Sequence, residues 1–402
     1  MQLHSALVVF LCFGGFVHPQ TPADLSRLLV TIFDGYNNRI RPIQNQTEPI
    51  LLDISMYLFS INEVDEVEKK LVTTGYLEVR WTDGLLKWDP DLWNRTIYLT
   101  VPQDSIWKPD LVLKNGFTRF EEMGESFNYV FLANDGSVIW KPYEVFETRC
   151  SIDITYFPYD TQVCKITFIV WTYTVSEVDI ESTSYGIEFY EYEENSVWSI
   201  IKTDSFLKTL SSESEVSFTI TLQRKPRYYI INIILPIVCL GFMGVLAFVV
   251  PADAGEKMSY SVTVFLSFAV FLTIISAQLP VNSETSSFLS LYLIFQMILG
   301  ALVLVMSSVQ LRLHHRKSNQ NISRFFVGAV MAERCLRCRR KCHHSRKVQT
   351  CFVEKYVENE MLHESGIEWH DVTSAIDFFC FWIFLIVNTA ATITLFLVIS
   401  RP

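Results

Sequence analysis

Four long stretches of this 402-residue chain contain no acidic or basic side chain, and they constrain its fold more than any other feature. The stretches are Tyr228–Ala252, Met258–Ser283, Thr285–Leu311 and Phe378–Ser400. A bilayer core of about 30 Å needs roughly 20 apolar helical residues, so each stretch is long enough to cross it. Buried helices of soluble proteins rarely avoid charge for so long. We therefore expect four transmembrane helices, at residues 228–250, 257–280, 286–311 and 377–400.

Charge and a short leader predict how these helices are oriented. The apolar run Ala6–Phe16 is too short to span a bilayer and is followed by Pro19, so residues 1–20 are interpreted as a signal peptide. Residues 312–376 hold 12 Lys and Arg against 7 Asp and Glu, as expected of a cytoplasmic loop. A secreted amino terminus and four crossings place both termini outside the cell, in a multi-pass plasma-membrane protein.

The segment between the leader and the first apolar stretch, residues 21–227, is predicted to be an acidic extracellular domain. It holds 32 acidic against 19 basic residues, a field that enriches cations near its surface. Only two of the nine cysteines, Cys150 and Cys164, fall in this oxidising compartment, so we expect a disulfide between them. Asn45 and Asn94 begin Asn-x-Thr sequences and are expected glycosylation sites.

Residue patterning predicts an all-β sandwich for this extracellular domain, immunoglobulin-like and with about ten strands. Leu25, Leu28, Leu29 and Ile32 recur at helical spacing, which indicates a short amphipathic helix within residues 22–37. From Pro49 onward, short runs of β-branched and aromatic residues alternate with turn residues, as is typical of sandwiches rather than of βαβ units. The run Asn134-Asp135-Gly136 indicates a hairpin turn.

The cytoplasmic loop, residues 312–376, divides into two parts by composition. Its first part is basic and predicted to be irregular, whereas Phe352–Ile376 has the spacing of an amphipathic helix that runs into the fourth span. A cysteine and histidine cluster lies between them. Zinc binding, palmitoylation and a reduced, solvated basic linker all remain open for it. The cluster comprises Cys335, Cys338, Cys342, His343, His344 and Cys351.

The second apolar stretch carries a stripe that predicts a water-filled pore. Five residues follow one helical face at steps of four or three, with hydroxyls toward the cytosolic end and aliphatic side chains above. Glu256 marks the inner end of this face. One helix cannot enclose water, so the stripe requires symmetry-related copies around an axis. The expected pore-lining residues are Glu256, Ser259, Thr263, Leu266, Val270 and Ile274.

Several motifs, taken together, give the chain a specific resemblance. They are Trp81-Thr82-Asp83, Trp107-Lys108-Pro109-Asp110, the thirteen residues between Cys150 and Cys164, Trp171-Thr172-Tyr173, Arg224, the run 251–257 and Pro280. With these motifs the chain resembles the Cys-loop receptors, the pentameric ligand-gated ion channels of the nicotinic acetylcholine receptor type. The resemblance implies a homopentamer or a pentamer of homologous subunits, with agonist bound between neighbouring extracellular domains and a postsynaptic location.

When the agonist site of the family is mapped onto this sequence residue by residue, some positions match and others differ. The resemblance implies Trp171, Tyr173, Phe206 and Lys114 on the principal face, and Tyr76, Phe131, Ile139 and Lys141 on the complementary face. Aromatic rings suit a cationic amine. Lys114, however, stands where the family has tyrosine, and Lys208-Thr209 stands where it has a vicinal cysteine pair. An ammonium at Lys114 repels a cation unless Glu213 or another carboxylate offsets it, so a zwitterionic or acidic ligand stays open.

The resemblance also implies a coupling region between the agonist site and the pore. The loop tip at Phe157, Pro158 and Asp160, the turn at Glu63 and Val64, and Arg224 are expected to converge above Pro280. Either Asp160 or Glu63 could pair with Arg224. Proline stiffens the partners so that a small rotation is passed on rather than absorbed.

These observations predict a subunit of a cation-selective, ligand-gated channel. Ala254-Gly255-Glu256 resembles the cation-conducting branch of the family, and carboxylate rings at a pore mouth select cations. The expected partners are identical or homologous subunits, a small-molecule agonist, the lipid bilayer and permeant cations, with no nucleic acid, cofactor or metal. The alternatives are an anion-conducting or modulatory subunit of the same family, and, as a different class, a transporter or a membrane enzyme.

Overall fold

A computed structural model describes residues 21–118, 122–209, 212–251, 255–276, 286–316, 322–342 and 367–400. The chain forms two compact units. The sheet unit comprises Met1–Ser151, Val163–Asn195 and Ile200–Leu222, and the helix unit comprises Ile152–Gln162, Ser196–Ser199 and Gln223–Pro402. The expected signal peptide, Pro280 and the part of the expected amphipathic helix at 352–366 lie outside the described residues.

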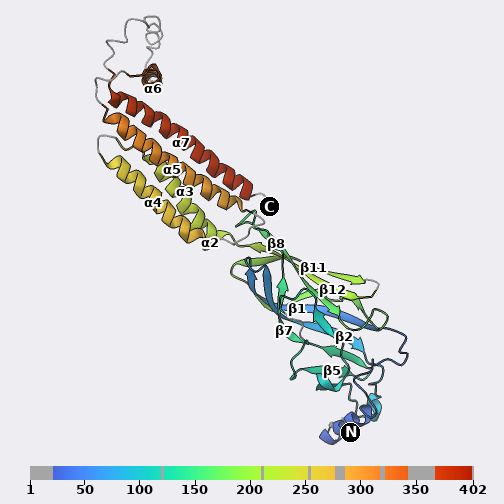
Figure 1. The fold of residues 1–402 in the computed structure, drawn as a ribbon. Coiled ribbons are helices and arrows are strands. Elements are labelled where there is room, and N and C mark those ends of the chain that lie inside the picture. Colours follow the sequence, from blue (N-terminus) through green and yellow to red (C-terminus); the bar gives the residue numbers. More distant parts are fainter. Residues whose placement is uncertain are drawn as a thin grey trace, which may run out of the picture. The chain divides into compact units, whose positions relative to one another are not determined.

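The sheet unit is a β-sandwich preceded by one short helix, α1, at Pro22–Ile32 (Figure 1). The Thr21 side chain caps this helix by accepting a hydrogen bond from the Asp24 amide, and the Asp24 carboxylate accepts one from the Thr21 amide. The helix ends at Ile32, slightly earlier than the sequence indicated, and Gly35 follows in the left-handed conformation with φ 73°. Its buried residue is Leu28, one of the four leucine and isoleucine positions predicted to face inward.

The larger of the two sheets has eight strands. Its strand order is β10-β1-β2-β6-β5-β3, with β7 also paired to β2 and β9 to β1. The strands are β1 Ile50–Asp65, β2 Lys70–Thr82, β3 Tyr98–Pro102, β5 Tyr129–Ala133, β6 Ser137–Trp140, β7 Tyr143–Arg149, β9 Val178–Ser182 and β10 Ile187–Glu193. Two short 3-10 helices, Pro90–Leu92 and Gln103–Ser105, flank β3. The predicted turn at Gly136 joins β5 to β6.

The smaller sheet has the order β11-β12-β8-β4. Its strands are β4 Leu111–Leu113, β8 Thr161–Val170, β11 Trp198–Thr209 and β12 Ser214–Arg224. Phe168 on β8 meets Phe146 of the larger sheet at a ring-centroid distance of 5.4 Å and Phe218 of β12 at 6.1 Å. These rings are fully buried, so they form the layer of core between the two sheets. The Cys150–Cys164 disulfide is present, with 5.1 Å between the Cα atoms.

The strand prediction was right for most strands and missed β4, β9, β10 and β11. β1, β2, β3, β5, β8 and β12 coincide with alternating apolar runs. The run 137–146 divides into β6 and β7 at Pro142, which cannot donate to a ladder. β11 was missed because most of its residues beyond Ile201 are exposed or half-buried, so its sequence carries little alternation.

The helix unit contains the four expected transmembrane helices (Figure 1). The first span, Arg227–Leu246, consists of α2 at Arg227–Tyr229, a π-helical turn at Ile230–Ile234 and α3 at Leu235–Leu246. Pro236 lacks an amide proton, so it cannot complete the regular ladder, and the π turn precedes it. The others are α4 Glu256–Ser276, α5 Phe288–His314 and α7 Trp369–Ile399. α7 begins at Trp369, earlier than the expected residue 377.

One prediction for residues 312–376 was wrong. The basic stretch expected to be irregular contains helix α6, Arg324–Cys342. Val330 on this helix is 1% exposed and packs with Trp369, Val372 and Ala375 of α7. Its apolar positions that pack, Phe326 and Val330, are confined to the first half of the helix, and the basic residues from Arg334 onward dominate the composition of the rest.

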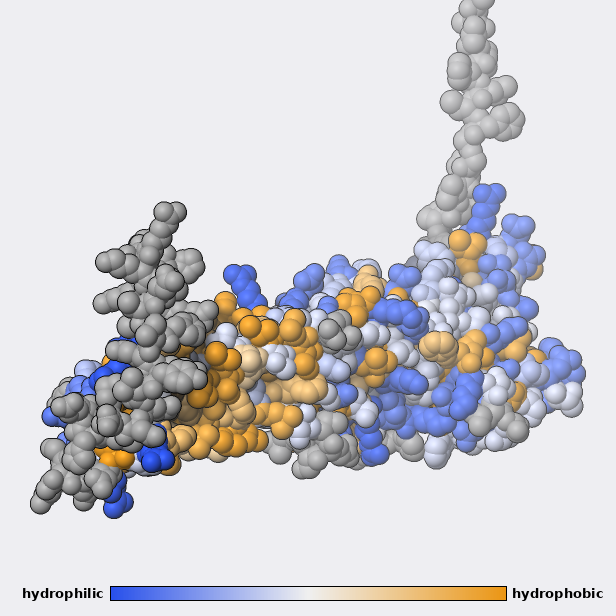
Figure 2. Space-filling model, turned by 90° about the horizontal axis from the view of Figure 1, so that it is seen from above, coloured by the Kyte–Doolittle hydropathy of each residue, from blue (hydrophilic) through white to orange (hydrophobic). Residues whose placement is uncertain are grey.

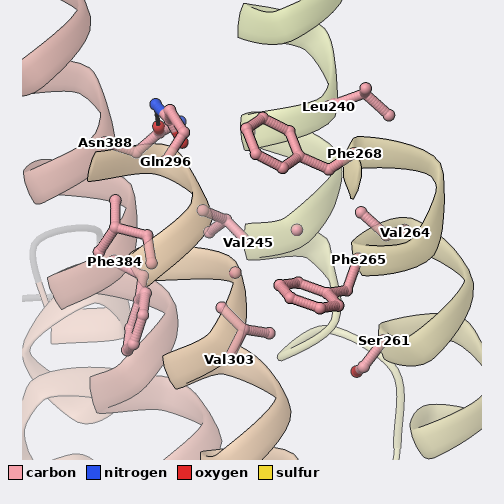
Figure 3. A pocket seen from close by; sticks show the side chains of 14 residues that line it. Leu240, Val245, Ser261, Val264, Phe265, Phe268, Gln296, Val303, Phe384 and Asn388 are labelled. Atoms are coloured by element: carbon pink, nitrogen blue, oxygen red, sulfur yellow. Dashed lines mark hydrogen bonds between the residues drawn. The ribbon is translucent and has the colours of Figure 1, made fainter. Parts of the chain in front are cut away.

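The interior of the helix unit is largely apolar, and one of its buried polar groups links α5 to α7. Figure 3 shows Phe265 and Phe268 of α4 beside Leu240 and Val245 of α3, with Gln296 of α5 opposite. Gln296 Nε2 donates to Asn388 Oδ1 at 2.7 Å and to the Tyr292 hydroxyl at 2.8 Å. This contact joins α5 to α7 inside an apolar core, where such polar contacts favour one register between neighbouring helices.

The outward surface of the helix unit is hydrophobic, as Figure 2 shows on the face it displays. Exposed aliphatic side chains on α5 and α7 include Val305, Ile383, Ile386, Ile393 and Leu397. All four long helices have the length and composition to cross a bilayer. The chain is therefore a multi-pass membrane protein.

The β5–β6 turn supplies a direct test of the fold. Gly136 has φ 88°, and a methyl group at its Cα would press on the backbone oxygen of Asp83. We expect Gly136→Ala to lower the free energy of unfolding by at least about 1–2 kcal/mol, from the left-handed conformation alone. The thermal midpoint of the detergent-solubilised full chain, followed by size-exclusion chromatography, measures the loss.

A glycine without these constraints is the control. Gly328 in α6 has no neighbouring atom within 4 Å of an added Cβ, so Gly328→Ala should leave the midpoint unchanged or raise it slightly. Equal midpoints for the two variants would contradict the turn assignment.

Candidate functional site

The disulfide loop holds a buried ion pair with the start of the first transmembrane span. Arg224 Nε donates to Asp160 Oδ1 at 2.7 Å and a second guanidinium nitrogen donates to Oδ2 at 3.0 Å. Their side chains are 2% and 1% exposed. Gln162 donates to the same carboxylate at 2.6 Å. Of the two acids predicted as partners for Arg224, the structure places Asp160 there.

Aromatic rings enclose the Arg224 guanidinium. It lies 4.2 Å from the ring centroid of Trp198, 4.9 Å from that of Phe157 and 5.6 Å from that of Tyr229. The Phe157–Pro158 peptide bond, at the tip of the loop, is cis. A cation that cannot be deprotonated is thus held by both a carboxylate and ring faces, which makes this cluster rigid.

The same loop contacts the beginning of α5. The Phe288 amide donates to the Thr155 carbonyl at 3.1 Å, and the rings of Tyr156 and Phe288 are 5.6 Å apart. Loop, first span and third span therefore meet within the helix unit. Glu63 and Val64 end β1 in the sheet unit, where they pair with Val72 and Leu71. Pro280 lies outside the described residues.

Trp171, the central residue expected on the principal face, follows β8 and is 58% exposed. Its amide donates to the Asp110 carbonyl at 3.1 Å, and the Thr172 amide donates to Asp110 Oδ2 at 2.6 Å. Asp110 thus anchors the backbone while the indole faces outward. Tyr173 accepts a hydrogen bond from the indole of Trp107 at 3.4 Å, and Phe206 on β11 is 58% exposed.

Two carboxylates offset the positive charge of Lys114. Its ammonium lies 2.7 Å from Glu215 and 3.3 Å from Glu213. The hydrogen bond to Glu215 raises the pKa of Lys114, and the charge of Glu215 and the bond to Glu213 add to this effect against the opposing effect of burial. The lysine is therefore a cation, yet this group of three carries a net negative charge. Of the carboxylates left open in the sequence analysis, Glu213 and Glu215 both lie beside Lys114, and Glu215 is the closer.

Three of the residues expected on the complementary face line one hollow. It has a volume of about 440 Å³ and includes Phe131, Ile139 and Lys141. Phe131 stacks on Tyr98 at 5.2 Å. Lys141 joins this hollow to Tyr76, because its ammonium lies 5.5 Å from the Tyr76 ring and 2.7 Å from Glu78.

The face of α4 predicted to line a pore is exposed in the subunit. Leu266, Val270 and Ile274 are 60%, 53% and 54% exposed, and Glu256, Ser259 and Thr263 are also exposed. The buried residues of the same helix, Lys257, Ser261, Phe268 and Ile275, form the opposite face. α4 packs through that face against α3 and α5.

The structure describes the expected glycosylation sites and part of the cysteine and histidine cluster. Asn45 and Asn94 are exposed, and the Asn45 side chain accepts hydrogen bonds from Thr47. Cys335 is an exposed free cysteine on α6. The side chains of Cys338 and Cys342, and the whole of His343, His344 and Cys351, lie outside the described part of the chain.

Sequence reasoning missed four residues that shape these sites. Glu215 lies two positions from Glu213 in the same extended segment, and Glu78 lies two positions from Tyr76, so strand alternation could have found both. Trp198 and Tyr229 carried no such signal. Trp198 is distant from Arg224 along the chain, and Tyr229 follows Arg224 beyond the end of the strand, so strand alternation relates neither of them to Arg224.

Comparison with known proteins agrees with this geometry. Residues 25–226 match the neurotransmitter-gated ion-channel ligand binding domain, and residues 233–350 match the neurotransmitter-gated ion-channel transmembrane region. The chain therefore belongs to the neurotransmitter-gated ion-channel family, a family of channels rather than of enzymes.

Individual relatives are similar over most of this chain. The neuronal acetylcholine receptor subunit alpha-6 of Mus musculus is 32% identical over 324 residues, which cover 78% of this chain and 65% of the relative. The acetylcholine receptor subunit beta-type lev-1 of Caenorhabditis elegans is 33% identical over 292 residues, covering 72% and 57%. The neuronal alpha-3 subunit of Bos taurus is 31% identical over 296 residues, covering 72% and 60%. The chain thus spans less than two thirds of the length of these relatives.

The buried pair at Arg224 generates a stability prediction. Arg224→Gln leaves the Asp160 carboxylate buried without its cation, and removing one partner of such a pair costs about 3–5 kcal/mol. We expect Arg224→Gln to reduce strongly the amount of folded protein at the cell surface, measured by surface biotinylation. The double variant Arg224→Gln with Asp160→Asn should recover part of it.

An exposed ion pair provides the matched control. Arg27 and Asp24 are 72% and 26% exposed, so Arg27→Gln should change surface amounts little. If Arg224→Gln behaves like Arg27→Gln, the buried pair does not stabilise the fold.

Proposed function

We propose that the chain is a subunit of a cation-selective channel in the plasma membrane, opened by an extracellular small-molecule ligand. The observation that carries this function is the exposed stripe of α4. Leu266, Val270 and Ile274 are more than half exposed, although the opposite face of the same helix is buried. A stripe that mixes a carboxylate, hydroxyls and aliphatic residues suits water better than lipid. Copies of the subunit around an axis supply that water-filled space.

Glu256 is the residue proposed to select cations. It is exposed at the first residue of α4, whereas its neighbour Lys257 is 1% exposed and pairs with Asp377 of α7. Of these two adjacent charges, the acidic one is therefore available to an ion and the basic one is neutralised inside the bundle. Several copies of Glu256 around the axis form a ring of negative charge, which attracts cations.

The proposed agonist is an organic cation bound between the extracellular domains of neighbouring subunits. The exposed Trp171 and Phe206 offer ring faces, and the group formed by Lys114, Glu213 and Glu215 has a net negative charge. The hollow at Phe131, Ile139 and Lys141 supplies the facing surface in the adjacent subunit. Relatives named acetylcholine receptor subunits support this class of ligand. In this arrangement both termini are extracellular and the segment bearing α6 is cytoplasmic.

The position of Lys208 and Thr209 favours a second candidate function, in which the chain assembles with a different subunit. These residues stand where the principal face of the family carries paired cysteines, while the complementary hollow is complete. A subunit of this kind can contribute the complementary face in a mixed pentamer. Such a subunit gives no current alone but alters the agonist response of a co-expressed principal subunit.

Oocyte expression tests the proposed function and the role of Glu256 together. The chain, either alone or together with a principal subunit of the family, should give currents evoked by organic amines, and the reversal potential of these currents should follow sodium rather than chloride. Glu256→Lys should shift the reversal potential toward that of chloride, because the ring changes sign.

The control is a substitution at the adjacent residue, whose charge lies inside the bundle and not on the proposed axis. Lys257→Arg keeps the pair with Asp377 and should leave the reversal potential unchanged. A current carried by chloride in the unaltered chain, or no shift with Glu256→Lys, would reject cation selection by this ring.

A further inference from the structure

The ladder between β4 and β8 places Trp171 and Lys114 on one face of the smaller sheet. Its register continues one residue beyond each end. At one end the Trp171 amide donates to the Asp110 carbonyl at 3.1 Å, and at the other the Lys114 amide donates to the Thr167 carbonyl at 2.7 Å. Phe168 of β8 points into the core between the sheets, so Thr167 and Trp171 point to the outer face. Lys114 lies opposite Thr167 in the ladder and shares that face.

Strand β12 brings two carboxylates to the same outer face. β12 is the neighbour of β8 in the sheet, and the Ser217 hydroxyl lies 3.0 Å from the Thr167 hydroxyl. Glu215 and Glu213 precede Ser217 by two and four residues, so alternation gives them the same orientation. Lys114 reaches across β8 to both acids. The exposed indole, the ammonium and the two carboxylates therefore belong to one surface.

This surface has one carboxylate more than it has cations. Lys114 bonds Glu215 at 2.7 Å, and the Glu215 side chain is only 12% exposed. Glu213 is farther from the ammonium, at 3.3 Å, and its side chain is 50% exposed. In the described part of the chain, Lys114 is the cation that contacts these two acids. A carboxylate has about four acceptor sites, so Glu213 keeps both charge and hydrogen-bonding capacity for a ligand.

Hydrogen bonding decides which kind of organic cation this surface suits. A protonated primary or secondary amine donates N–H groups to a carboxylate, and such charge-assisted bonds are about twice as strong as neutral ones. A quaternary ammonium has no N–H group and is recognised by ring faces. The outer face does offer the rings of Trp171 and Phe206, but Lys114 stands where the resemblance implies a tyrosine. An exposed acid beside fewer rings favours a cation that can donate hydrogen bonds.

We propose that Glu213 makes the agonist site selective for a protonated primary or secondary amine over a quaternary ammonium. The ammonium group of the ligand bonds Glu213, and its apolar body lies against Trp171 and Phe206. Lys114 does not attract a ligand carboxylate, because Glu215 already engages its charge and the group as a whole is negative. This selectivity rests on the proposed function, which locates the agonist site, and narrows its organic cation to one chemical class.

Calorimetric titration of the purified full chain, assembled in detergent at neutral pH, tests this selectivity. The first two probes are phenethylamine and its N,N,N-trimethyl derivative, which share a ring and a positive charge but differ in their N–H groups. Phenethylamine should bind about tenfold more tightly, because it alone makes a hydrogen bond to the carboxylate. Phenylalanine adds a carboxylate to the same amine and should bind more weakly than phenethylamine, because the site is already negative.

A variant and a matched control assign the preference to one residue. Glu213→Gln keeps the size of the side chain but removes its charge, so the ratio of the two cation affinities should fall to about threefold or less. Asp91→Asn removes an exposed acid from the 3-10 helix Pro90–Leu92 of the same unit. This control should leave the ratio unchanged, because long-range effects of charge act equally on both probes.

The possible results separate this selectivity from the proposed function. Equal or tighter binding of the trimethyl derivative, or an unchanged ratio in Glu213→Gln, would overturn the amine selectivity and leave an organic-cation agonist in place. Failure of both cations to bind would reject the selectivity and the proposed agonist class together. Phenylalanine binding as tightly as phenethylamine would assign the site to a zwitterion instead.

Discussion

The ion pair between Asp160 and Arg224 is the interaction on which the rest of the structure depends. It joins the tip of the disulfide loop to the residues that enter the first transmembrane span, and both side chains are almost completely buried. A buried pair stabilises only if its remaining hydrogen-bonding groups are satisfied. Here Gln162 bonds the carboxylate, while Trp198, Phe157 and Tyr229 surround the guanidinium. The same loop bonds the first residue of α5, so two transmembrane helices are located by one rigid cluster.

A second constraint acts inside the helix unit. α4 has one face that packs against its own subunit and another that does not, and the change occurs between adjacent residues at Glu256 and Lys257. Lys257 is neutralised by Asp377 of α7, which leaves Glu256 as the exposed charge. The proposed ion selection therefore depends on α7, although α7 does not contribute to the α4 stripe.

The sequence predicted those parts of the fold in which a period or a length carries the information. Four charge-free stretches gave four helices, alternation gave the strands with one buried face, and a step of three or four gave the exposed stripe of α4. The disulfide was predicted because only Cys150 and Cys164 fall in the segment expected to be extracellular and therefore oxidising. β11 and α6 were missed because neither carries a regular apolar pattern.

The candidate sites were less predictable because they depend on pairings between distant segments. Asp160 and Glu63 were equally acceptable partners for Arg224 in sequence, and only the fold selects Asp160. The sequence named Glu213 or another carboxylate as the partner of Lys114, and the fold brings Glu215 closest, at 2.7 Å. The enclosure of Arg224 by Trp198 likewise follows from β11, a strand that the sequence did not indicate.

The accessibility of single cysteines along α4 tests the central claim most directly. In the full chain assembled in a membrane, Ser259→Cys, Leu266→Cys and Val270→Cys should react with a charged, water-soluble thiol reagent, because the proposed pore brings water to this face. Phe268→Cys, on the buried face, should react no faster than the unaltered chain with its native cysteines. If the three exposed positions react no faster than Phe268→Cys from either side of the membrane, α4 does not line an aqueous pore.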